Sequence, residues 1–359
     1  MTRRAETKWS DSMQAPNHSE GGASETRSLH AAMFRIVNVQ IEGEDASPIH
    51  LMSDFLLFPS GSAQLWDSLH PKAYLAAGDW CGMHELIYLK NRSLVAYSAT
   101  DYSELDDRQK GRLLYGLMSE LDGLFNTLWI FRDHAASVLP GWILDALSNR
   151  FVRADSSWPT CRCTGSTDVA VVQREEIESA KQLNRMLFPR GKSSAHRNTS
   201  EIVHGDQHRL GRSLRFIRAA RSTLGSSVKL ANYTFALESL LSWHGGTRYQ
   251  NEGAKGRIGR IVASLVAQTP KARQFASEVV QEMFRVRDKV AHGQILGASQ
   301  VERLGETVEK ADHLLRMLIR AMIDNETTQP FICRRLSKSE SRKFQEFLDG
   351  LGRANGEPN

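Results

Sequence analysis

The sequence predicts an α+β protein in which a mixed α/β N-terminal domain is followed by an all-α helical bundle. Between residues 34 and 188, short apolar segments typical of β-strands are interspersed with helical segments. After residue 206, apolar side chains recur only at helical spacing. A stretch rich in Gly, Ser and Asn at 189–206 lacks a helical stripe and separates the two patterns. A domain that contains strands is therefore followed along the chain by a domain that contains only helices.

Composition bounds the class of protein. With 359 residues and 41% hydrophobic content, the chain is long enough for two domains or one large one and can fill their cores. It has no apolar run of membrane-spanning length and no charged-then-apolar leader, so we expect a cytoplasmic protein without a membrane partner. Four cysteines do not make a disulfide framework in a chain of this size. A net charge of +5, carried more by Arg than by Lys, suits nucleic acid, but ordinary solvated surface or a GC-rich genome explains it equally well.

The N-terminal half divides into a tail and a domain. Residues 1–30 are polar and poor in large apolar side chains, so we expect a disordered tail. In the domain at 31–188, the pattern predicts a strand at 34–41, a hairpin of 86–89 with 94–97, a helix at 105–134, a strand at 169–172 and a helix at 174–188. Leu and Trp residues at helical spacing between 113 and 142 are expected in the core. No motif in this domain specifies a reaction.

The C-terminal half is predicted to be helical throughout. After the linker at 189–206, a helical domain at 207–325 is expected to hold helices at 207–224, 229–244, 254–267, 271–292 and 298–323. A C-terminal extension at 326–359 should carry a short helix near 337–349. The helix from 271 places Phe275, Val279, Met283, Val286 and Val290 within about 80° of one another, which predicts one buried face.

Arg and His at the end of that helix are the strongest candidates for chemistry. Arg–His pairs with four to six residues between them occur four times, at Arg190/His196, Arg197/His204, Arg285/His292 and Arg287/His292, so spacing alone decides nothing. The first two pairs lie in the expected linker. His292 instead ends a helix with a defined apolar face, and Gly293 is the residue expected to stop that helix.

Helical geometry favours a site shared between two subunits. Arg287 and His292 are five positions apart and diverge by about 140° on a straight helix, so one helix cannot easily aim both at one phosphate. Asp288 and His292 share a face, so Asp288 could orient the imidazole. The motif therefore favours a homodimer. In the alternative structural interpretation, Arg287 lies at the rim of the core and His292 only caps its own helix.

Other charged residues could support RNA binding. Arg209, Arg212, Arg215, Arg218 and Arg221 recur every third residue, and residues 205–262 hold ten Lys/Arg against three Asp/Glu. Arg212, Arg215 and Arg218, together with Arg257 and Arg260, form a candidate RNA-binding surface, with a merely solvated helix as the alternative. Arg221 drifts toward the apolar side of its helix, where it needs a partner such as a carboxylate or a phosphate.

Two further residues or motifs have competing interpretations. Glu238 could be a supporting group that pairs with Arg257 or Arg260, or it could be a plain structural carboxylate. Cys161-Arg162-Cys163 invites a zinc site, but no second pair of ligands follows at finger spacing. We therefore expect no metal and no cofactor.

Three segments taken in order resemble a known family. Phe235-Ala236-Leu237-Glu238-Ser239-Leu240-Leu241-Ser242 is followed by Glu252, Arg257 and Arg260, and then by Val286-Arg287-Asp288-Lys289-Val290-Ala291-His292-Gly293. This order resembles the HEPN domain family, most of all the ApeA-type HEPN proteins of bacterial defence, over roughly residues 207–323. Arg287, Asp288 and His292 meet the family's Arg–polar–x3–His pattern, with Asp where Asn or Ser is common.

The resemblance implies a metal-independent endoribonuclease that is active as a HEPN homodimer and serves as an anti-phage defence or toxin effector in abortive infection. His292 would transfer protons, Arg287 would stabilise charge on the phosphorus, and Asp288 would hold His292. The N-terminal domain would recognise a phage or cellular trigger. The main alternative is a non-catalytic module that binds RNA or a nucleotide, or only dimerises. A third is an N-terminal enzyme of unknown chemistry with a helical accessory domain.

Overall fold

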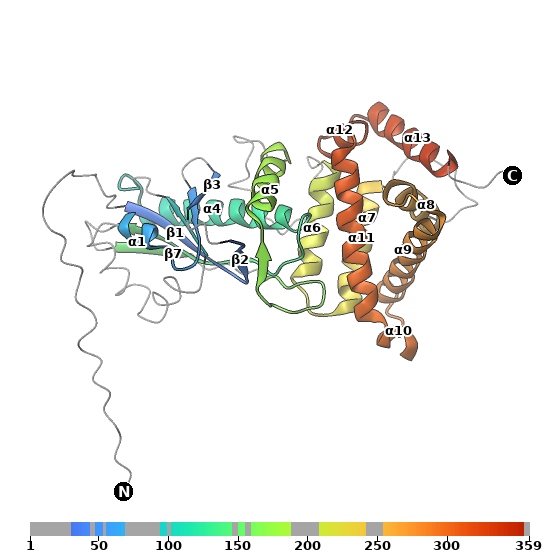
Figure 1. Cartoon of the computed structure of the whole chain (residues 1–359), viewed down its shortest axis with the longest axis horizontal. Helices are drawn as coiled ribbons and strands as arrows, with labels where there is room; N and C mark the ends of the chain where they lie inside the picture. The colour runs from blue at the N-terminus through green and yellow to red at the C-terminus, as the bar shows by residue number, and fades with distance from the viewer. Residues whose placement is uncertain are drawn as a thin grey trace, which may run out of the picture.

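Figure 1 shows the computed structural model of the chain, in which residues 30–43, 47–52, 55–68, 94–98, 102–145, 150–154, 159–187, 208–241 and 254–354 are described. A strand-bearing N-terminal part is followed by a helical part, so the predicted α+β class is confirmed. The tail predicted at 1–30 falls outside the described residues except for His30, as does the linker predicted at 189–206 with its Arg–His pairs.

The N-terminal part is built on a six-stranded antiparallel sheet with the order β3-β4-β5-β1-β6-β7. Its strands are β1 (His30–Val37), β3 (Ile49–Met52), β4 (Phe55–Phe58), β5 (Leu94–Ser98), β6 (Ser137–Asp145) and β7 (Arg150–Ala154). The long helix α4 (Asp107–Leu128) covers one face, where its Leu114 and Leu121 share a core with Phe34. On the other face Met33 and Trp142 form a smaller core with Leu65 of α1 (Ala63–Ser68). The sheet is therefore apolar on both sides.

The strand predicted at 34–41 is two strands in different sheets. β1 ends at Val37, and β2 (Val39–Ile41) pairs in parallel with β8 (Ala170–Val172), which confirms the strand expected at 169–172. The break falls at Asn38, whose φ of 63° lies in the left-handed region that Asn tolerates better than most residues. Asn38 Nδ2 also donates to Ala135 O at 3.2 Å, which ties the bend to the chain that follows α4.

The predicted hairpin is described only in its second strand. β5 confirms the strand at 94–97 and pairs with β1 on one side and with β4 on the other. Residues 86–89 themselves lie outside the described part of the chain. Trp142 is fully buried, as expected, but it lies on strand β6 and not at a helical position.

Helices α4 and α5 (Arg174–Leu187) confirm the two helices predicted before the linker. A capping box sets the start of α4: the Asp106 side chain accepts from Gln109 N–H at 2.7 Å, and the Gln109 side chain accepts from Asp106 N–H at 2.9 Å. α4 ends at Leu128 and not near residue 134. Trp129 and Ile130, which directly follow the helix, pack into the core of the helical bundle before the chain returns to the sheet as β6.

The C-terminal part is a helical bundle around α7 (Figure 1). Its helices are α6 (Arg209–Arg221), α7 (Ser226–Leu241), α8 (Ala254–Val266), α9 (Pro270–Ala291), α10 (Ala298–Glu302), α11 (Leu304–Asp324), α12 (Gln329–Ile332) and α13 (Lys338–Ala354). α7 packs against α6, α9 and α11, and its Tyr233 and Leu237 share one core with Met283 of α9 and Leu315 of α11. The five helices predicted between 207 and 323 are therefore present.

Two features of the bundle differ from expectation. The helix predicted at 298–323 is divided at Arg303 into α10 and α11. The segment expected as an extension after 325 also packs into the bundle, because Ile332, Phe344 and Leu348 belong to its buried core. The C-terminal helix α13 lies against α8 and completes the helical part.

The two parts of the chain share one buried junction. Trp129 and Ile130, which directly follow α4, belong to the core of the bundle. Asp312 of α11 is fully buried and accepts hydrogen bonds from Trp129 Nε1 at 2.9 Å, Tyr233 Oη at 2.8 Å and Arg316 Nε at 2.9 Å. Arg320 of α11 donates to the Ile130 carbonyl at 2.8 Å. The end of α4 is thus held by both packing and directed polar contacts.

We predict that Asp312→Ala lowers the free energy of unfolding by about 3–5 kcal/mol, because it leaves the half-buried guanidinium of Arg316 and the buried donors of Trp129 and Tyr233 without an acceptor. Urea denaturation of the full chain measures the change. Asp324→Ala, at an exposed position near the end of the same helix, is the control and should change stability by no more than about 0.5 kcal/mol. Equal effects of the two substitutions would contradict the role given to Asp312.

Candidate functional site

The C-terminal end of α9 is the first element of the candidate site. Thr269 caps its start, and the Thr269 Oγ1 accepts from Ala272 N–H at 3.2 Å. At the other end, Gly293 adopts a φ of 64° and donates to the Val290 carbonyl at 3.2 Å, while Gln294 donates to the Lys289 carbonyl at 2.8 Å. These two bonds form a Schellman motif, so the predicted role of Gly293 as the helix stop is confirmed.

Arg287 lies on the side of α9 that faces α7. Its Nη2 donates to Glu238 Oε1 at 2.6 Å and its Nη1 donates to Asp288 Oδ1 at 2.9 Å. The guanidinium also lies 5.0 Å from the ring centre of Phe284 and 5.8 Å from that of Phe235. Its Nε is buried without a hydrogen-bond partner among the described residues. The side chain keeps 22% of its surface exposed, so part of it is in contact with solvent.

His292 is the C-terminal cap of α9 and is exposed. Its backbone N–H donates to the Asp288 carbonyl at 3.0 Å. The carboxylate of Asp288 pairs with Arg287, and within the described part of the chain no hydrogen bond joins it to the His292 imidazole. The expectation that Asp288 orients His292 is therefore wrong for the single subunit, and Asp288 instead neutralises Arg287.

The apolar face predicted for α9 is largely confirmed. Val279, Met283 and Val286 are buried, and Val290 packs against the same core while partly exposed. The prediction that Phe275 is buried is wrong, because this residue keeps 48% of its surface exposed. Lys310 of α11 lies over its ring, with Nζ 5.8 Å from the ring centre.

Glu238 joins the site through a partner that the sequence did not indicate. It lies on α7 and binds Arg287, whereas Arg257 pairs with Asp349 of α13 at 2.7 Å. Arg260, the other expected partner, is exposed on α8. Glu238 is therefore joined to Arg287, a partner that the sequence did not indicate, and its supporting role stays a prediction.

The basic row of α6 is turned largely toward the interior. Arg209 is buried and donates to the Leu240 carbonyl at 3.2 Å, and burial lowers its pKa to about 10. Arg218 pairs with Asp122 of α4 at 2.7 Å. Arg212 and Arg215 are partly buried. Of the five expected RNA-binding residues, Arg218 and Arg257 are thus already bound to carboxylates of this chain.

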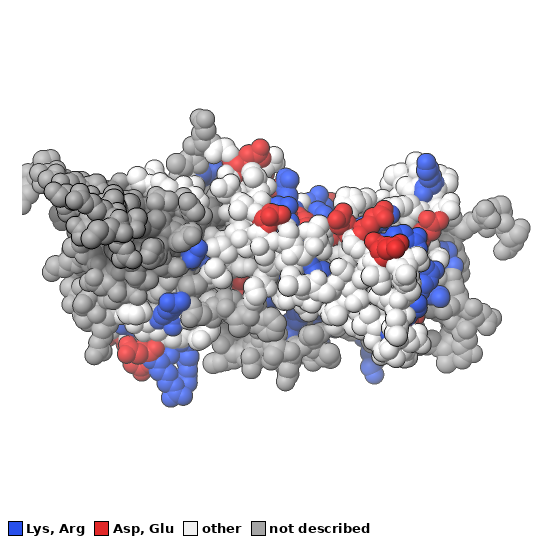
Figure 2. All heavy atoms as spheres, turned by 90° about the horizontal axis from the view of Figure 1, so that it is seen from below, with Lys and Arg blue, Asp and Glu red and all other residues white. Residues whose placement is uncertain are grey.

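Charges of both signs are mixed on the face of the helical part that Figure 2 shows, where acidic side chains adjoin basic ones. The end of α9 follows the same pattern. Residues 282–310 contain five basic and five acidic side chains, Arg285, Arg287, Lys289, Arg303 and Lys310 against Glu282, Asp288, Glu302, Glu306 and Glu309. Any phosphate contact at this end would therefore rely on individual side chains and not on a broad positive field.

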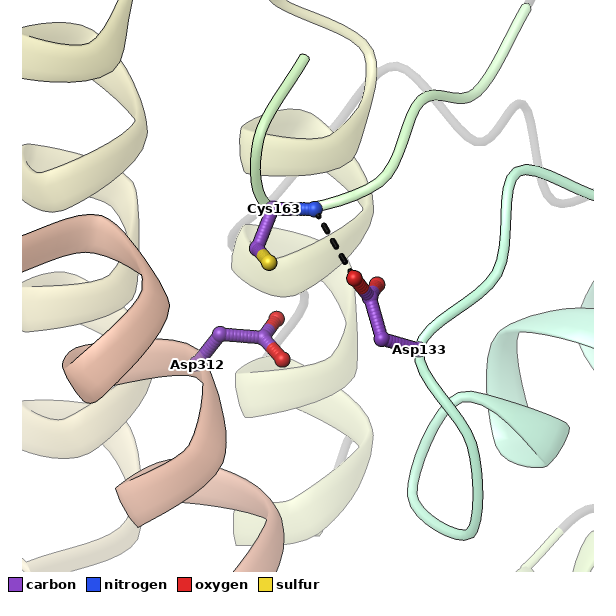
Figure 3. A group of neighbouring side chains, drawn as sticks. All are labelled: Asp133, Cys163 and Asp312. Atoms are coloured by element: carbon purple, nitrogen blue, oxygen red, sulfur yellow. Dashed lines mark hydrogen bonds between the residues drawn. The ribbon is translucent and has the colours of Figure 1, made fainter. Parts of the chain in front are cut away.

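A second cluster of potential ligands lies at the junction between the two parts. Asp133, Cys163 and Asp312 each offer one ligand atom, and these atoms lie within 4.8 Å of one another (Figure 3). Asp133 Oδ2 accepts from the Cys163 backbone N–H at 3.2 Å, while Asp133 Oδ1 is buried with no partner among the described residues. Cys161 is turned to α6, where its thiol donates to the Arg221 carbonyl at 3.0 Å.

The chemistry of this cluster does not suit a metal ion. Asp312 is already matched by the guanidinium of Arg316, and the buried Arg221 lies near both carboxylates. Both oxygens of Asp312 already accept hydrogen bonds, Oδ1 from Trp129 Nε1 and Tyr233 Oη, and Oδ2 from Arg316 Nε. A metal ion would have to displace these donors. We therefore assign no metal site to these three residues.

His134 and Arg221 complete the junction. His134 Nδ1 accepts from Ala136 N–H at 2.9 Å and from Arg221 Nη2 at 3.1 Å, so the proton of the neutral ring lies on Nε2, which donates to the Phe125 carbonyl at 2.9 Å. Arg221 also donates to the His134 carbonyl at 2.6 Å. The partner of Arg221 is thus His134 and not the carboxylate or phosphate that we expected. Burial, and then the charge of Arg221, lower the pKa of His134 well below 6.5.

Comparisons of the chain with protein-family models, with curated proteins and with solved structures find no match. The resemblance to HEPN proteins therefore stays a hypothesis that rests on the residues quoted above. Among the described helices, none is both long enough and apolar enough to cross a membrane.

We predict that His134 makes the protein sensitive to acid below pH 6.5. In the unfolded chain, the His134 imidazole takes up a proton near its ordinary pKa of 6.5, whereas the buried imidazole of the folded protein stays neutral. The contribution of His134 to the free energy of unfolding is therefore complete above pH 6.5 and is lost as the pH falls from 6.5 toward the lower pKa of the folded state. Between pH 7.5 and 5.5, the stability of the wild type relative to His134→Asn should fall by about 1.4 kcal/mol.

Urea denaturation at the two pH values measures this difference, and groups common to both proteins cancel. His313→Asn, at an exposed position on α11, is the control. A wild type and a His134→Asn protein with parallel pH profiles would show that His134 is not the titrating group.

Proposed function

We propose that this protein is a metal-independent endoribonuclease of HEPN type that acts as a homodimer in bacterial anti-phage defence, in the manner of a toxin. One observation carries the proposal: the solvent-accessible guanidinium of Arg287 and the exposed imidazole of His292 lie about one and a half turns apart at the end of one ordered helix. A cytoplasmic location is part of the same proposal.

The chemistry of the two side chains suits RNA cleavage. His292 takes the proton from a ribose 2′-hydroxyl, and the oxygen attacks the adjacent phosphorus. Arg287 stabilises the added negative charge as the phosphorus becomes five-coordinate. The bond to the 5′-oxygen breaks and this oxygen receives a proton, which leaves a 2′,3′-cyclic phosphate and a 5′-hydroxyl. No metal takes part in this scheme.

A second copy of the chain would complete the site. Because Arg287 and His292 diverge on one helix, the imidazole that acts with a given Arg287 is supplied by the other subunit. The segment after His292 offers a contact surface, since Ile295 is 92% exposed, Val301 is 55% exposed and α10 has no buried residue. Gln300 holds this segment to α9 through Lys289 at 2.6 Å and Glu282 at 3.3 Å. An ordered, apolar projection beside His292 suits a subunit contact.

The second candidate function is a non-catalytic module that binds RNA or a nucleotide, or only dimerises. The observation that favours it is the pairing of Asp288 with Arg287, which leaves His292 without an orienting carboxylate in the single subunit. In both functions the N-terminal domain would recognise a trigger, and the junction with α11 would pass that event to the bundle.

We predict that the purified chain, in the presence of its trigger if one is needed, cleaves RNA in excess EDTA and that His292→Ala abolishes the cleavage. Loss of a general acid–base group typically costs about 10²- to 10⁴-fold in rate. Product ends identified by mass spectrometry should be a cyclic phosphate and a 5′-hydroxyl.

The matched control is His313→Ala, which removes another exposed histidine of the bundle and should leave the rate unchanged. Cleavage that survives His292→Ala, or that requires a divalent metal, would refute the proposed site. A folded wild type that never cleaves RNA would favour the binding module.

We also predict that Ile295→Asp shifts the dimer to monomer, because a charge on an apolar contact must be desolvated when the subunits meet. Light scattering after size exclusion measures the mass. Leu224→Asp, which is 76% exposed at the turn between α6 and α7, is the control and should leave the dimer intact. A wild type that is monomeric at all concentrations would rule out the shared site.

A further inference from the structure

We propose that Glu238 competes with the RNA phosphate for Arg287, so that a carboxylate of the protein itself closes the resting site. This inference rests on the proposed function and adds to it a means of regulation at the same guanidinium. The site would open when Glu238 is displaced.

Both terminal nitrogens of the Arg287 guanidinium already bind carboxylates of the protein. Nη2 is bound to Glu238 and Nη1 to Asp288, and the described surroundings offer Nε no acceptor. A phosphate binds a guanidinium through the same N–H groups that these carboxylates occupy. An RNA phosphate must therefore displace at least one carboxylate before it can bind Arg287.

The charge of the cluster also opposes an incoming phosphate. One guanidinium faces two carboxylates, so the group carries a net charge of −1 in the resting protein. Removing one carboxylate makes the group neutral, and the arrival of a phosphodiester then meets no net repulsion. The competition is thus electrostatic as well as geometric.

Glu238 is the carboxylate better suited to this role. It reaches Arg287 from another helix, α7, at 2.6 Å and is 26% exposed, whereas Asp288 is the chain neighbour of Arg287, binds it at 2.9 Å and is 49% exposed. Because the Glu238–Arg287 pair is shorter and more buried than the Asp288–Arg287 pair, Glu238 opposes the binding of a phosphate more strongly. The rings of Phe284 and Phe235 lie beside the guanidinium and would keep it in place when Glu238 leaves.

A carboxylate that only positions Arg287 would behave in the opposite way. If Glu238 holds Arg287 in its active geometry, Glu238→Gln should weaken RNA binding. If Glu238 competes with phosphate, Glu238→Gln should strengthen binding, because the amide is neutral and retains the shape of the side chain. The sign of the change therefore separates the two roles.

The experiment measures binding of a fluorescent 2′-O-methyl oligoribonucleotide to the full chain by fluorescence anisotropy at low salt. This probe lacks the nucleophilic 2′-hydroxyl, so binding is measured without cleavage. We expect Glu238→Gln to lower Kd by about three- to tenfold, the effect of one partly screened charge near the phosphate. The gain should shrink as salt is raised.

Glu340→Gln is a matched control. Glu340 is 32% exposed and pairs with an arginine, Arg334, at 2.8 Å, but it lies on α13 and does not touch Arg287. This variant removes the same charge from the same helical part and should change Kd by less than about twofold. In addition, Arg287→Gln should abolish the gain from Glu238→Gln, since the two residues act as a pair.

Weaker or unchanged binding by Glu238→Gln, or an equal gain from Glu340→Gln, would overturn the inference. Should Glu238→Gln not fold, Glu238→Asp, which withdraws the carboxylate by one methylene, takes its place and should give a smaller gain in the same direction. Failure of the nuclease proposal is distinguishable from failure of this inference. Tighter RNA binding by Glu238→Gln, without RNA cleavage by any variant, would support the competition between Glu238 and phosphate and refute the nuclease activity.

Discussion

The fully buried carboxylate of Asp312 is the interaction on which the arrangement of the two parts depends. A charge in that position costs several kcal/mol unless partners compensate it, and its three donors come from the end of α4, from α7 and from α11 itself. Trp129 therefore cannot leave the bundle without losing the acceptor of its own N–H and removing one of the three donors of the carboxylate. Arg320, which donates to the Ile130 carbonyl, adds a second fixed point about two turns farther along α11.

The helical part could be predicted from sequence much better than the sheet, and burial explains the difference. The long helices α9 and α11 each have one buried and one exposed face, so a helical period is visible, whereas the central helix α7 is buried nearly all round. The central strand β1 is buried on both faces, with Ala31, Ala32, Met33 and Phe34 all inaccessible, so its apolar residues do not alternate. β4 has the same character. The break at Asn38 depends on a contact with Ala135, which no local pattern reveals.

The candidate site shows the same division between local and long-range information. Helix periodicity and the glycine signal placed His292 and Gly293 correctly at the end of α9. The partner of Arg287 could not be found in this way, because Glu238 is 49 positions away and the rotation of α7 against α9 decides which side chains meet. Arg218 likewise meets Asp122 across 96 positions, so a row of arginines that suggested an RNA surface is partly used inside the molecule.

The helix α11 connects the junction to the candidate site through continuous contacts. It carries Asp312 and Arg320 at the junction, and it begins directly after α10. α10 is tied to α9 by Gln300, which lies between Lys289 and Glu282. Rigid helices and packed cores move as units, so a displacement of the α4 end must either break the contacts of Asp312 or carry α11 with it. In the second case the displacement reaches α9, because α11 packs against α9 and α10 is tied to it through Gln300. The contacts of α11 therefore join the end of α4 to the end of α9, where His292 lies.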